Sequence, residues 1–213
     1  MIVILQVEQL SKSYNRRIIF EGISFTMEPG DRLVVTGPNG SGKSTLLKII
    51  CGLLQPSSGT VHLSNGSKKM DLAERKQCCG YASPEVNLYD RLTAYENLSF
   101  FAALRGLPPC RERMVELLKR LQLKEYMHQP LCSYSSGMKQ RVKLACALLH
   151  EPCLLLLDEP SCNLDEQGRR ALEELLNLRP LHGITIIATN ETEEVEKFGQ
   201  KLLSLGVPPG GAA

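Results

Sequence analysis

The stretch GPNGSGKST, residues 37–45, decides how the rest of this chain is interpreted. It follows the apolar run 33–36 and precedes LLKII, residues 46–50, whose composition is typical of a helix. The pattern G-x-x-x-x-G-K-[ST] between a strand and a helix predicts a loop that holds the phosphates of a nucleotide. Glycines at 37, 40 and 42 let successive backbone N–H groups point at one phosphate chain. The helix that follows adds its unsatisfied N–H groups and the positive end of its dipole.

Two side chains of this stretch carry the chemistry of a phosphate site. Lys43 supplies a positive charge for the β- and γ-phosphates, and the Ser44 hydroxyl is a ligand for Mg²⁺. A glycine-rich turn that binds nothing is the alternative, and it is disfavoured because the motif positions and both flanks match. The sequence therefore predicts that a nucleoside triphosphate with Mg²⁺ binds at Gly37, Pro38, Asn39, Gly40, Ser41, Gly42, Lys43, Ser44 and Thr45.

A pair of carboxylates follows a second apolar run. Residues 153–157, CLLLL, are typical of a strand buried on both faces of a parallel sheet, and Asp158 and Glu159 follow it directly. The carboxyl ends of such strands form the edge where ligands bind. We therefore expect Asp158 to hold Mg²⁺ through water and Glu159 to orient and deprotonate an attacking water. The alternative is a solvated acidic turn, which the phosphate loop makes weaker.

Composition narrows the class of protein further. The 25 basic and 23 acidic residues of this 213-residue chain leave a net charge of +2 and are scattered, so no nucleic-acid partner is expected. No apolar run approaches the roughly 20 residues that cross a bilayer. The N-terminal stretch MIVILQVEQL lacks the features of a signal peptide. We therefore expect a cytoplasmic protein that meets a membrane only through a partner.

The remaining patterns predict an α/β fold. Strands are expected at 2–10, 18–20, 23–27 and 60–63, with turns at 11–15, 28–31 and 65–66, which together suggest an antiparallel sheet. Helices are expected at 96–105, at 111–123 and from Ser135 or Ser136, as N-cap, toward His150. The apolar residues with helical spacing in the second of these helices are Met114, Leu117, Leu118 and Leu121. A helix at 166–178, a strand at 183–188, a helix at 191–198 and a strand at 201–205 complete the pattern.

These elements predict one domain over residues 1–206. Its nucleotide core, 1–84 and 153–206, would contain a mostly parallel sheet flanked by helices together with the antiparallel part. An inserted helical lobe would occupy 85–152 and include the helix that follows Ser135. Residues 207–213 are rich in Pro, Gly and Ala, and we expect a flexible tail there.

Taken together, the motifs resemble those of the ATP-binding subunit of an ABC transporter, from about residue 7 to residue 205. GPNGSGKST resembles the Walker A motif, and LLLLDEP, residues 154–160, resembles Walker B. YSSGMKQR, residues 134–141, resembles the family signature, with Ser135, Ser136 and Gly137 at its serine and glycine positions. Residues 162–165 resemble the D-loop, and Tyr14 stands where the family has an aromatic residue that stacks on the base. The chain is most similar to haem-exporter and multidrug-exporter subunits.

The resemblance implies a P-loop ATPase that hydrolyses ATP with Mg²⁺. Two such domains would pair head to tail, so that each ATP lies between the Walker A motif of one and the signature of the other. The second domain would be another copy of this chain. A separate transmembrane permease subunit would convert closing and opening into transport and would hold the protein at the inner face of the cell membrane.

Two positions depart from the family pattern. A glutamine that contacts Mg²⁺ and the attacking water is replaced by Pro84, so Ser83 or Glu85 would have to act, or a water would fill the coordination shell. The switch histidine is replaced by Asn190, which can still donate a hydrogen bond to the γ-phosphate. We expect Asn190 to act with Lys43 and Glu159 in catalysis. A hydrogen bond lost at such a position lowers the rate by about 10- to 1000-fold.

Three interpretations of the function remain open at this point. The first is an ATP-hydrolysing motor for a permease, and the second is an ATP-gated dimerising module with little hydrolysis. The third is a non-transport protein acting on ribosomes or DNA, which a single nucleotide domain and scattered charges disfavour. Tyr14 could equally be an ordinary surface tyrosine. A permease contact is expected within residues 85–101, although about half of its apolar residues should simply pack the lobe: Val86, Leu88, Tyr89, Leu92, Phe100 and Phe101.

Overall fold

The computed structural model describes residues 3–15, 17–108, 110–178 and 183–206, and it divides the chain into two compact units. The first unit comprises Met1–Cys79, Cys153–Asp158 and Pro180–Ala213. The second comprises Gly80–Pro152 and Glu159–Arg179. The strand β6 (Cys79–Ala82) lies where the chain passes from the first unit to the second. The domain boundaries expected from the sequence stay a prediction, and the expected tail at 207–213 lies outside the described residues.

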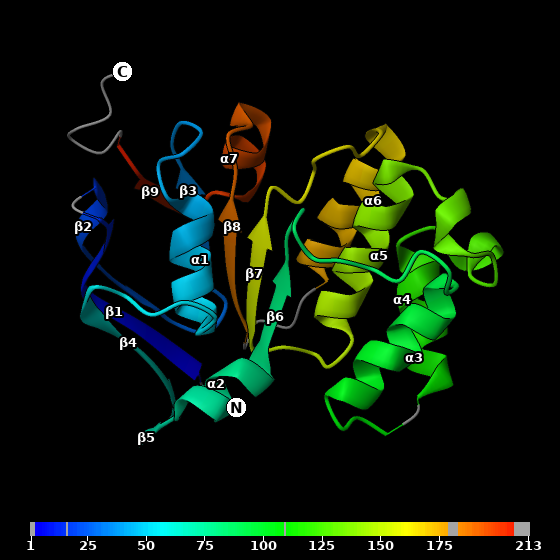
Figure 1. Cartoon of the computed structure of the whole chain (residues 1–213), viewed down its shortest axis with the longest axis horizontal. Helices are drawn as coiled ribbons and strands as arrows, with labels where there is room; N and C mark the ends of the chain where they lie inside the picture. The colour runs from blue at the N-terminus through cyan, green and yellow to red at the C-terminus, as the bar shows by residue number, and fades with distance from the viewer. Residues whose placement is uncertain (1–2, 16, 109, 179–182, 207–213) are drawn as a thin grey trace. The chain divides into compact units, whose positions relative to one another are not determined.

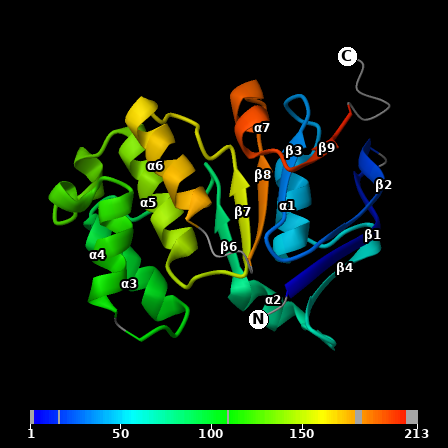
Figure 2. The same ribbon diagram turned by 180° about the vertical axis from the view of Figure 1, so that it is seen from behind.

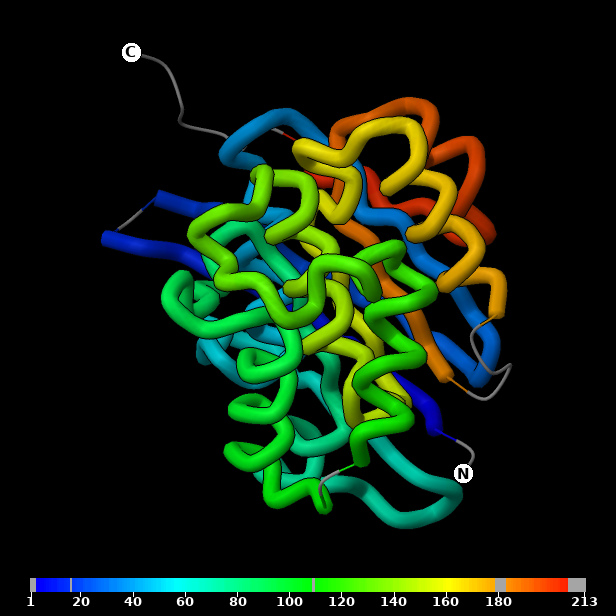
Figure 3. Tube along the Cα trace, turned by 90° about the vertical axis from the view of Figure 1, so that its right-hand side faces the viewer, coloured from blue at the N-terminus to red at the C-terminus, as the bar shows by residue number. Residues whose placement is uncertain are grey.

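An antiparallel sheet with strand order β2-β1-β4-β5 forms one part of the first unit. Its strands are β1 (Val3–Tyr14), β2 (Arg17–Met27), β4 (Ser58–Asn65) and β5 (Lys68–Lys69). Figure 3 shows β1 and β2, in dark blue, running side by side. The hairpin predicted at residues 65–66 is confirmed, because Ser64 pairs with Lys69 across it.

Two predictions in this region are wrong. The expected turn at 11–15 is the end of β1, and the two strands expected at 18–20 and 23–27 are one strand, β2. Polar residues interrupt the apolar pattern of both strands without ending them. The β1–β2 pairing absorbs them through register shifts between Val7 and Ser13, with Gln9 at φ 47°. Bulges of this kind keep an antiparallel ladder going across residues that break the alternation of apolar and polar side chains.

A parallel sheet forms the other part of the first unit. Its strands lie in the order β7 (Leu154–Asp158), β8 (Ile184–Ala188), β3 (Arg32–Thr36) and β9 (Lys201–Ser204). Every residue of β7 and β8 is buried, as their continuous apolar runs predict. Asp158 is level with Ala188 and Ala188 with Val35, so the carboxyl ends of three strands meet at one edge. Figures 1 and 2 show these strands side by side.

Helices of the first unit pack on this sheet. The helix α1 (Lys43–Cys51) contacts β7 and β8, and α7 (Thr192–Phe198) contacts β3. A further helix, α2 (Leu72–Cys78), escapes the sequence prediction. None of its residues is buried, so it lacks the apolar stripe that reveals a helix. Its start is instead set by a capping box, in which Asp71 and Glu74 satisfy each other's backbone N–H groups.

The second unit is helical. It contains α3 (Ala94–Leu104), α4 (Arg111–Arg120), α5 (Ser136–Leu148) and α6 (Glu166–Asn177), all expected from the sequence. The helices α3, α4 and α5 pack against one another. Their core includes the residues predicted from helical spacing, since Met114, Leu117, Leu118 and Leu121 are all buried. In the described residues, no helix is long and apolar enough to cross a membrane.

Candidate nucleotide site

Residues 37–42 form the loop that links β3 to α1 in the first unit. Gly37, Gly40 and Gly42 have φ values of 150°, 79° and 99°, which favour glycine. A Cβ atom on Gly37 would lie 2.3 Å from the carbonyl oxygen of Leu205. A Cβ atom on Gly42 would lie 2.5 Å from Cγ2 of Ile19. These contacts leave no room for a Cβ atom at Gly37 or Gly42, so both positions require glycine.

The start of α1 fits an anionic ligand. Gly42 occupies the N-cap position, and no side chain caps the helix among the described residues. The Ser41 side chain is 1% exposed, and its hydroxyl has no hydrogen-bond partner within the described part of the chain. An uncapped helix N-terminus leaves N–H groups and a positive dipole end for an anion. A buried hydroxyl without a partner is costly unless a ligand or water completes it.

Lys43 links the loop to residues distant in the sequence. Its side chain is only 5% exposed, and Nζ donates hydrogen bonds to the carbonyl oxygens of Gly37 (2.7 Å) and Pro38 (3.3 Å). Nζ also donates to Oδ1 of Asn190 at 2.5 Å. The Asn190 amide group donates in turn to Oδ1 of Asn39. Folding thus brings together four of the predicted site residues around one buried ammonium group.

The residues predicted to hold Mg²⁺ belong to the same unit. Asp158 is the last residue of β7 and is 4% exposed, and Ser44 lies in the first turn of α1. Carboxylate and hydroxyl oxygens are hard ligands of the kind that Mg²⁺ prefers. No group of three or more His, Cys, Asp or Glu side chains within the described ranges could hold a metal ion. These residues therefore fit Mg²⁺ as a partner of phosphate oxygens rather than in an all-protein cage.

Glu159 begins the second unit with an unusual backbone conformation. Its φ is 47°, in the left-handed region that costs a residue with a Cβ atom about 1–2 kcal/mol. The following turn is held by a hydrogen bond from the Cys162 N–H to the Glu159 carbonyl at 3.1 Å. The buried Gln140 side chain donates to the Pro160 carbonyl at 3.3 Å. The surrounding contacts thus hold the strained backbone at Glu159 in place, a condition often found at functional sites.

The segment that resembles the family signature starts α5. Ser135, rather than Ser136, is the N-cap, because its Oγ accepts a hydrogen bond from the Met138 N–H at 3.2 Å. Gly137 lies in the first turn, where a Cβ atom would be 2.5 Å from the carbonyl oxygen of Asn163. The residues that resemble the signature therefore touch those that resemble the D-loop within the second unit.

Replacing Gly137 by Ala is expected to destabilise the protein, although alanine favours helices by about 1 kcal/mol over glycine. The added methyl group would meet a backbone oxygen at 2.5 Å, and such an overlap costs about 1–3 kcal/mol unless the backbone moves. Thermal denaturation should show a lower midpoint. Gly206→Ala is the control, because nothing lies within 4 Å of the position that its Cβ atom would take and its φ is not in the left-handed region. Equal midpoints for wild type and Gly137→Ala would contradict the close contact with Asn163.

Lys143, in α5, is a candidate site residue that the sequence patterns did not reveal, and it contacts the loop after β6. The Pro84 carbonyl oxygen accepts a hydrogen bond from Nζ of Lys143, in α5, at 2.5 Å. Partial burial lowers the pKa of Lys143. Of the two side chains expected to compensate for Pro84, Ser83 is completely buried and Glu85 is exposed. Lys139 and Lys143 are spaced as i and i+4 on one helix, and that spacing is the signal that could have found this pair. Both line a pocket of about 290 Å³ within the second unit.

Tyr14 lies at the end of β1 with 47% of its surface exposed. The ammonium group of Lys12 lies 4.6 Å from the centre of its ring. This cation–π contact is compatible with both interpretations of Tyr14, as an ordinary surface residue and as a platform for a base. Its role in base stacking stays a prediction.

The fold and the glycine-rich loop define an α/β protein of the P-loop nucleotide-binding class. Residues 20–162 match the family model described as ABC transporter. The chain belongs to this family, as an ATP-binding domain, which confirms the resemblance inferred from the motifs.

Individual relatives agree with this assignment. The chain is 36% identical over 195 residues to the linearmycin resistance ATP-binding protein LnrL of Bacillus subtilis (strain 168), a match that covers 90% of this chain and 63% of LnrL. The chain likewise spans 64% and 65% of the length of two further B. subtilis relatives.

Solved structures show the same fold. One described as the ATP-binding subunit of an ABC transporter has a TM-score of 0.83 and 30% identity, covering 96% of this chain and 88% of that one. A dimeric post-hydrolysis structure of the ATP-binding cassette MJ0796, bound to ADP and phosphate, has a TM-score of 0.81 and 26% identity. That match covers 95% of this chain and 96% of the cassette. The predicted fold class is thereby confirmed.

Proposed function

We propose that this chain is the ATP-hydrolysing subunit of an exporter, which dimerises around Mg-ATP and drives a separate membrane permease. The observation that supports the proposal is that one chain holds two different structures, each of which would form half of an ATP site. One is the glycine-rich loop with the buried Lys43, and the other is the capped helix that starts at Ser135. Because these half-sites are different, two copies placed head to tail would complete two equivalent ATP sites.

In this proposal, each residue has a defined role. Lys43, now bonded to loop carbonyls and Asn190, would turn its charge to the β- and γ-phosphates of ATP. Ser44 and Asp158 would hold Mg²⁺, which would neutralise charge on the phosphates. Glu159 would accept the proton of the attacking water. The Ser135 hydroxyl and the N–H groups of its helix would contact the γ-phosphate bound to the partner copy. Tyr14 would stack on the base.

The dimeric arrangement and the exporter function rest on relatives. The cassette MJ0796 is a dimer that holds ADP and phosphate, and LnrL is named for resistance to linearmycin. By analogy, ATP would close a dimer of this chain and hydrolysis would let it open. The permease would be a separate polypeptide, and the protein would lie at the inner face of the cell membrane through it.

The permease contact is proposed at the aromatic group beside α3. Tyr89 has half of its surface exposed, and its ring packs edge-on against Phe100 with ring centres 4.7 Å apart. Phe100 makes a similar contact with Phe101 at 5.6 Å. Exposed aromatic side chains that are held rigid are typical anchors of protein interfaces.

An ATP-gated dimer with little hydrolysis is the second candidate. The observation that favours it is the engagement of Asn190 with both Lys43 and Asn39. Asparagine is shorter than histidine and never cationic, so it offers the γ-phosphate a weaker partner. The two candidates share the same dimer and differ in turnover.

Steady-state Mg-ATPase activity at a series of protein concentrations tests the proposal. Because two chains complete each site, the specific activity is expected to rise with protein concentration and to vanish in EDTA. Asn190→His is measured in parallel to separate the two candidates. A wild-type protein without measurable ATPase activity, beside an active Asn190→His variant, would favour the gated dimer. A specific activity independent of concentration, in a protein that stays monomeric with ATP, would contradict the shared site.

A further inference from the structure

Residues 89–93, here called the Tyr89 loop, lead into α3. The first residue of this loop carries the half-exposed aromatic ring that packs on Phe100. Its last residue, Thr93, is the N-cap of α3 and forms a capping box with Glu96. The loop therefore joins an exposed aromatic surface to a rigid helix start within the second unit.

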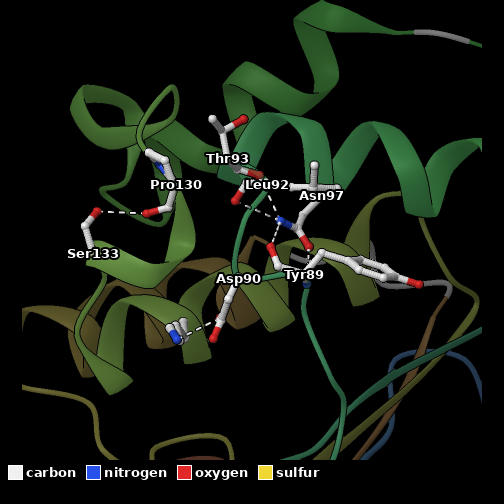
Figure 4. Close-up of polar contacts among 8 residues, drawn as sticks. Tyr89, Asp90, Leu92, Thr93, Asn97, Pro130 and Ser133 are labelled. Atoms are coloured by element: carbon white, nitrogen blue, oxygen red, sulfur yellow. Dashed lines mark hydrogen bonds and ion pairs between the residues drawn. The ribbon is translucent and has the colours of Figure 1, made fainter.

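Asn97 holds this loop from inside. Its side chain is completely buried, and Oδ1 accepts a hydrogen bond from the Tyr89 N–H at 2.9 Å. Its Nδ2 donates to the carbonyl oxygens of Tyr89 (3.1 Å), Leu92 (3.4 Å) and Thr93 (2.9 Å). Figure 4 shows these groups gathered around the amide. Only a neutral amide can both accept from an N–H group and donate to several carbonyls here, so the loop shape depends on asparagine.

The outer side of the loop is bonded to the segment that precedes the signature. The Leu131 N–H donates to the Leu92 carbonyl at 3.0 Å, and the Cys132 N–H donates to the Asp90 carbonyl at 2.8 Å. Thr93 and Pro130 form a β-bridge beside them. Because Ser135 follows Cys132 by three residues, these bonds place the chain just before the N-cap of α5.

The loop is also tied to α5 itself. A carboxylate oxygen of Asp90 lies 2.8 Å from Nζ of Lys139, which sits in the second turn of that helix (Figure 4). Residues 135–137 therefore lie between two contacts with the Tyr89 loop. The backbone hydrogen bond of Cys132 precedes them, and the ion pair of Lys139 follows them. Asp90 makes both of these contacts.

We propose that the Tyr89 loop sets the position of residues 135–137, with Asn97 as the positioning residue. This rests on the proposed function, in which Tyr89 meets the permease and the helix that starts at Ser135 meets ATP on the partner copy. Movement of the aromatic surface would then shift the second half-site directly, through short bonds between rigid segments. The permease would thereby control whether the half-site can engage ATP.

A first experiment needs no nucleotide and no partner. Asn97→Asp keeps the side-chain shape but removes the donors and turns an oxygen toward the loop carbonyls. Amide hydrogen exchange should become about 10-fold faster or more at Leu131, Cys132 and Met138, while α6 keeps its protection. Glu116→Gln, which breaks an exposed ion pair with Arg120 in the same unit, should leave those amides unchanged. Unchanged exchange in Asn97→Asp, or equal acceleration throughout the second unit, would overturn the inference.

A second experiment measures the half-site itself, in a Glu159→Gln background that keeps ATP intact. Asn97→Asp should weaken ATP-driven self-association in sedimentation by about 10-fold. The affinity of a single chain for fluorescent ATP should not change, since the phosphate loop is untouched. Asp90→Lys and Lys139→Asp should each weaken association by about 5-fold, and the double exchange should restore it.

The two experiments separate the inference from the function on which it rests. If the Glu159→Gln protein itself fails to self-associate in the presence of ATP, the proposed function is contradicted. Hydrogen exchange still decides the role of Asn97 in that case. If it associates and the Asn97 and Asp90 variants associate equally well, the inference alone is wrong. A double exchange that fails to restore association would also count against a role of the Asp90–Lys139 ion pair in positioning residues 135–137.

Discussion

Replacing Glu159 by Gln is expected to lower the steady-state Mg-ATPase activity of this protein by about 100- to 10,000-fold. The amide has the size and shape of the carboxylate but cannot accept a proton from water. The strained backbone at Glu159, with φ 47°, is the same for both residues, so the change is confined to the chemistry. The measurement is phosphate release at saturating Mg-ATP.

Glu151→Gln is the matched control for this prediction. Glu151 also has a positive φ, 51°, and its exposed carboxylate pairs with Arg113 at 3.3 Å on the helical unit. Its activity should stay close to that of wild type. ATP binding by Glu159→Gln should also be preserved, because the glycine-rich loop is unchanged. Activity in Glu159→Gln of half the wild-type value or more would show that another group activates the water.

Replacing Lys43 by Ala is expected to weaken nucleotide binding by about 100-fold or more. Hydrogen bonds from a charged donor contribute about 1.5–3 kcal/mol each, and Lys43 is expected to reach two phosphates. The substitution also leaves the Gly37 carbonyl and the Asn190 side chain without the ammonium group that now joins them. Affinity is measured by titration with a fluorescent ATP analogue, and turnover should disappear with it.

The matched control for this prediction lies on the same helix. Lys48→Ala removes an ammonium group from the last turn of α1, away from its N-terminus, and should leave the affinity within about 2-fold. Lys43→Met guards against a packing defect, because it fills the space of the buried side chain without the charge. Tight ATP binding by both Lys43 variants would show that the glycine-rich loop does not form the nucleotide site.

Much of the fold could be predicted because its signals are continuous in the sequence. The loop 37–42 lies between a buried strand and a helix, and β7 and β8 are unbroken apolar runs. Where burial is weak, prediction fails. The helix α2 buries none of its residues, and β1 continues through a polar stretch that is typical of a turn. In both places, hydrogen bonding rather than apolar patterning determines the structure.

The candidate site likewise has features that the sequence predicts and features that only the fold determines. Residue types and spacing within one stretch predicted a phosphate loop, a pair of carboxylates and a capped helix, because their chemistry depends on local backbone geometry. Folding alone places Asn190 on Lys43, 147 positions away, and Asn163 against Gly137. It also places the Leu131 N–H on the Leu92 carbonyl and the Asp90 carboxylate on Lys139. Such contacts join segments whose separation along the chain carries no local pattern, so only the packing of strands and helices decides them.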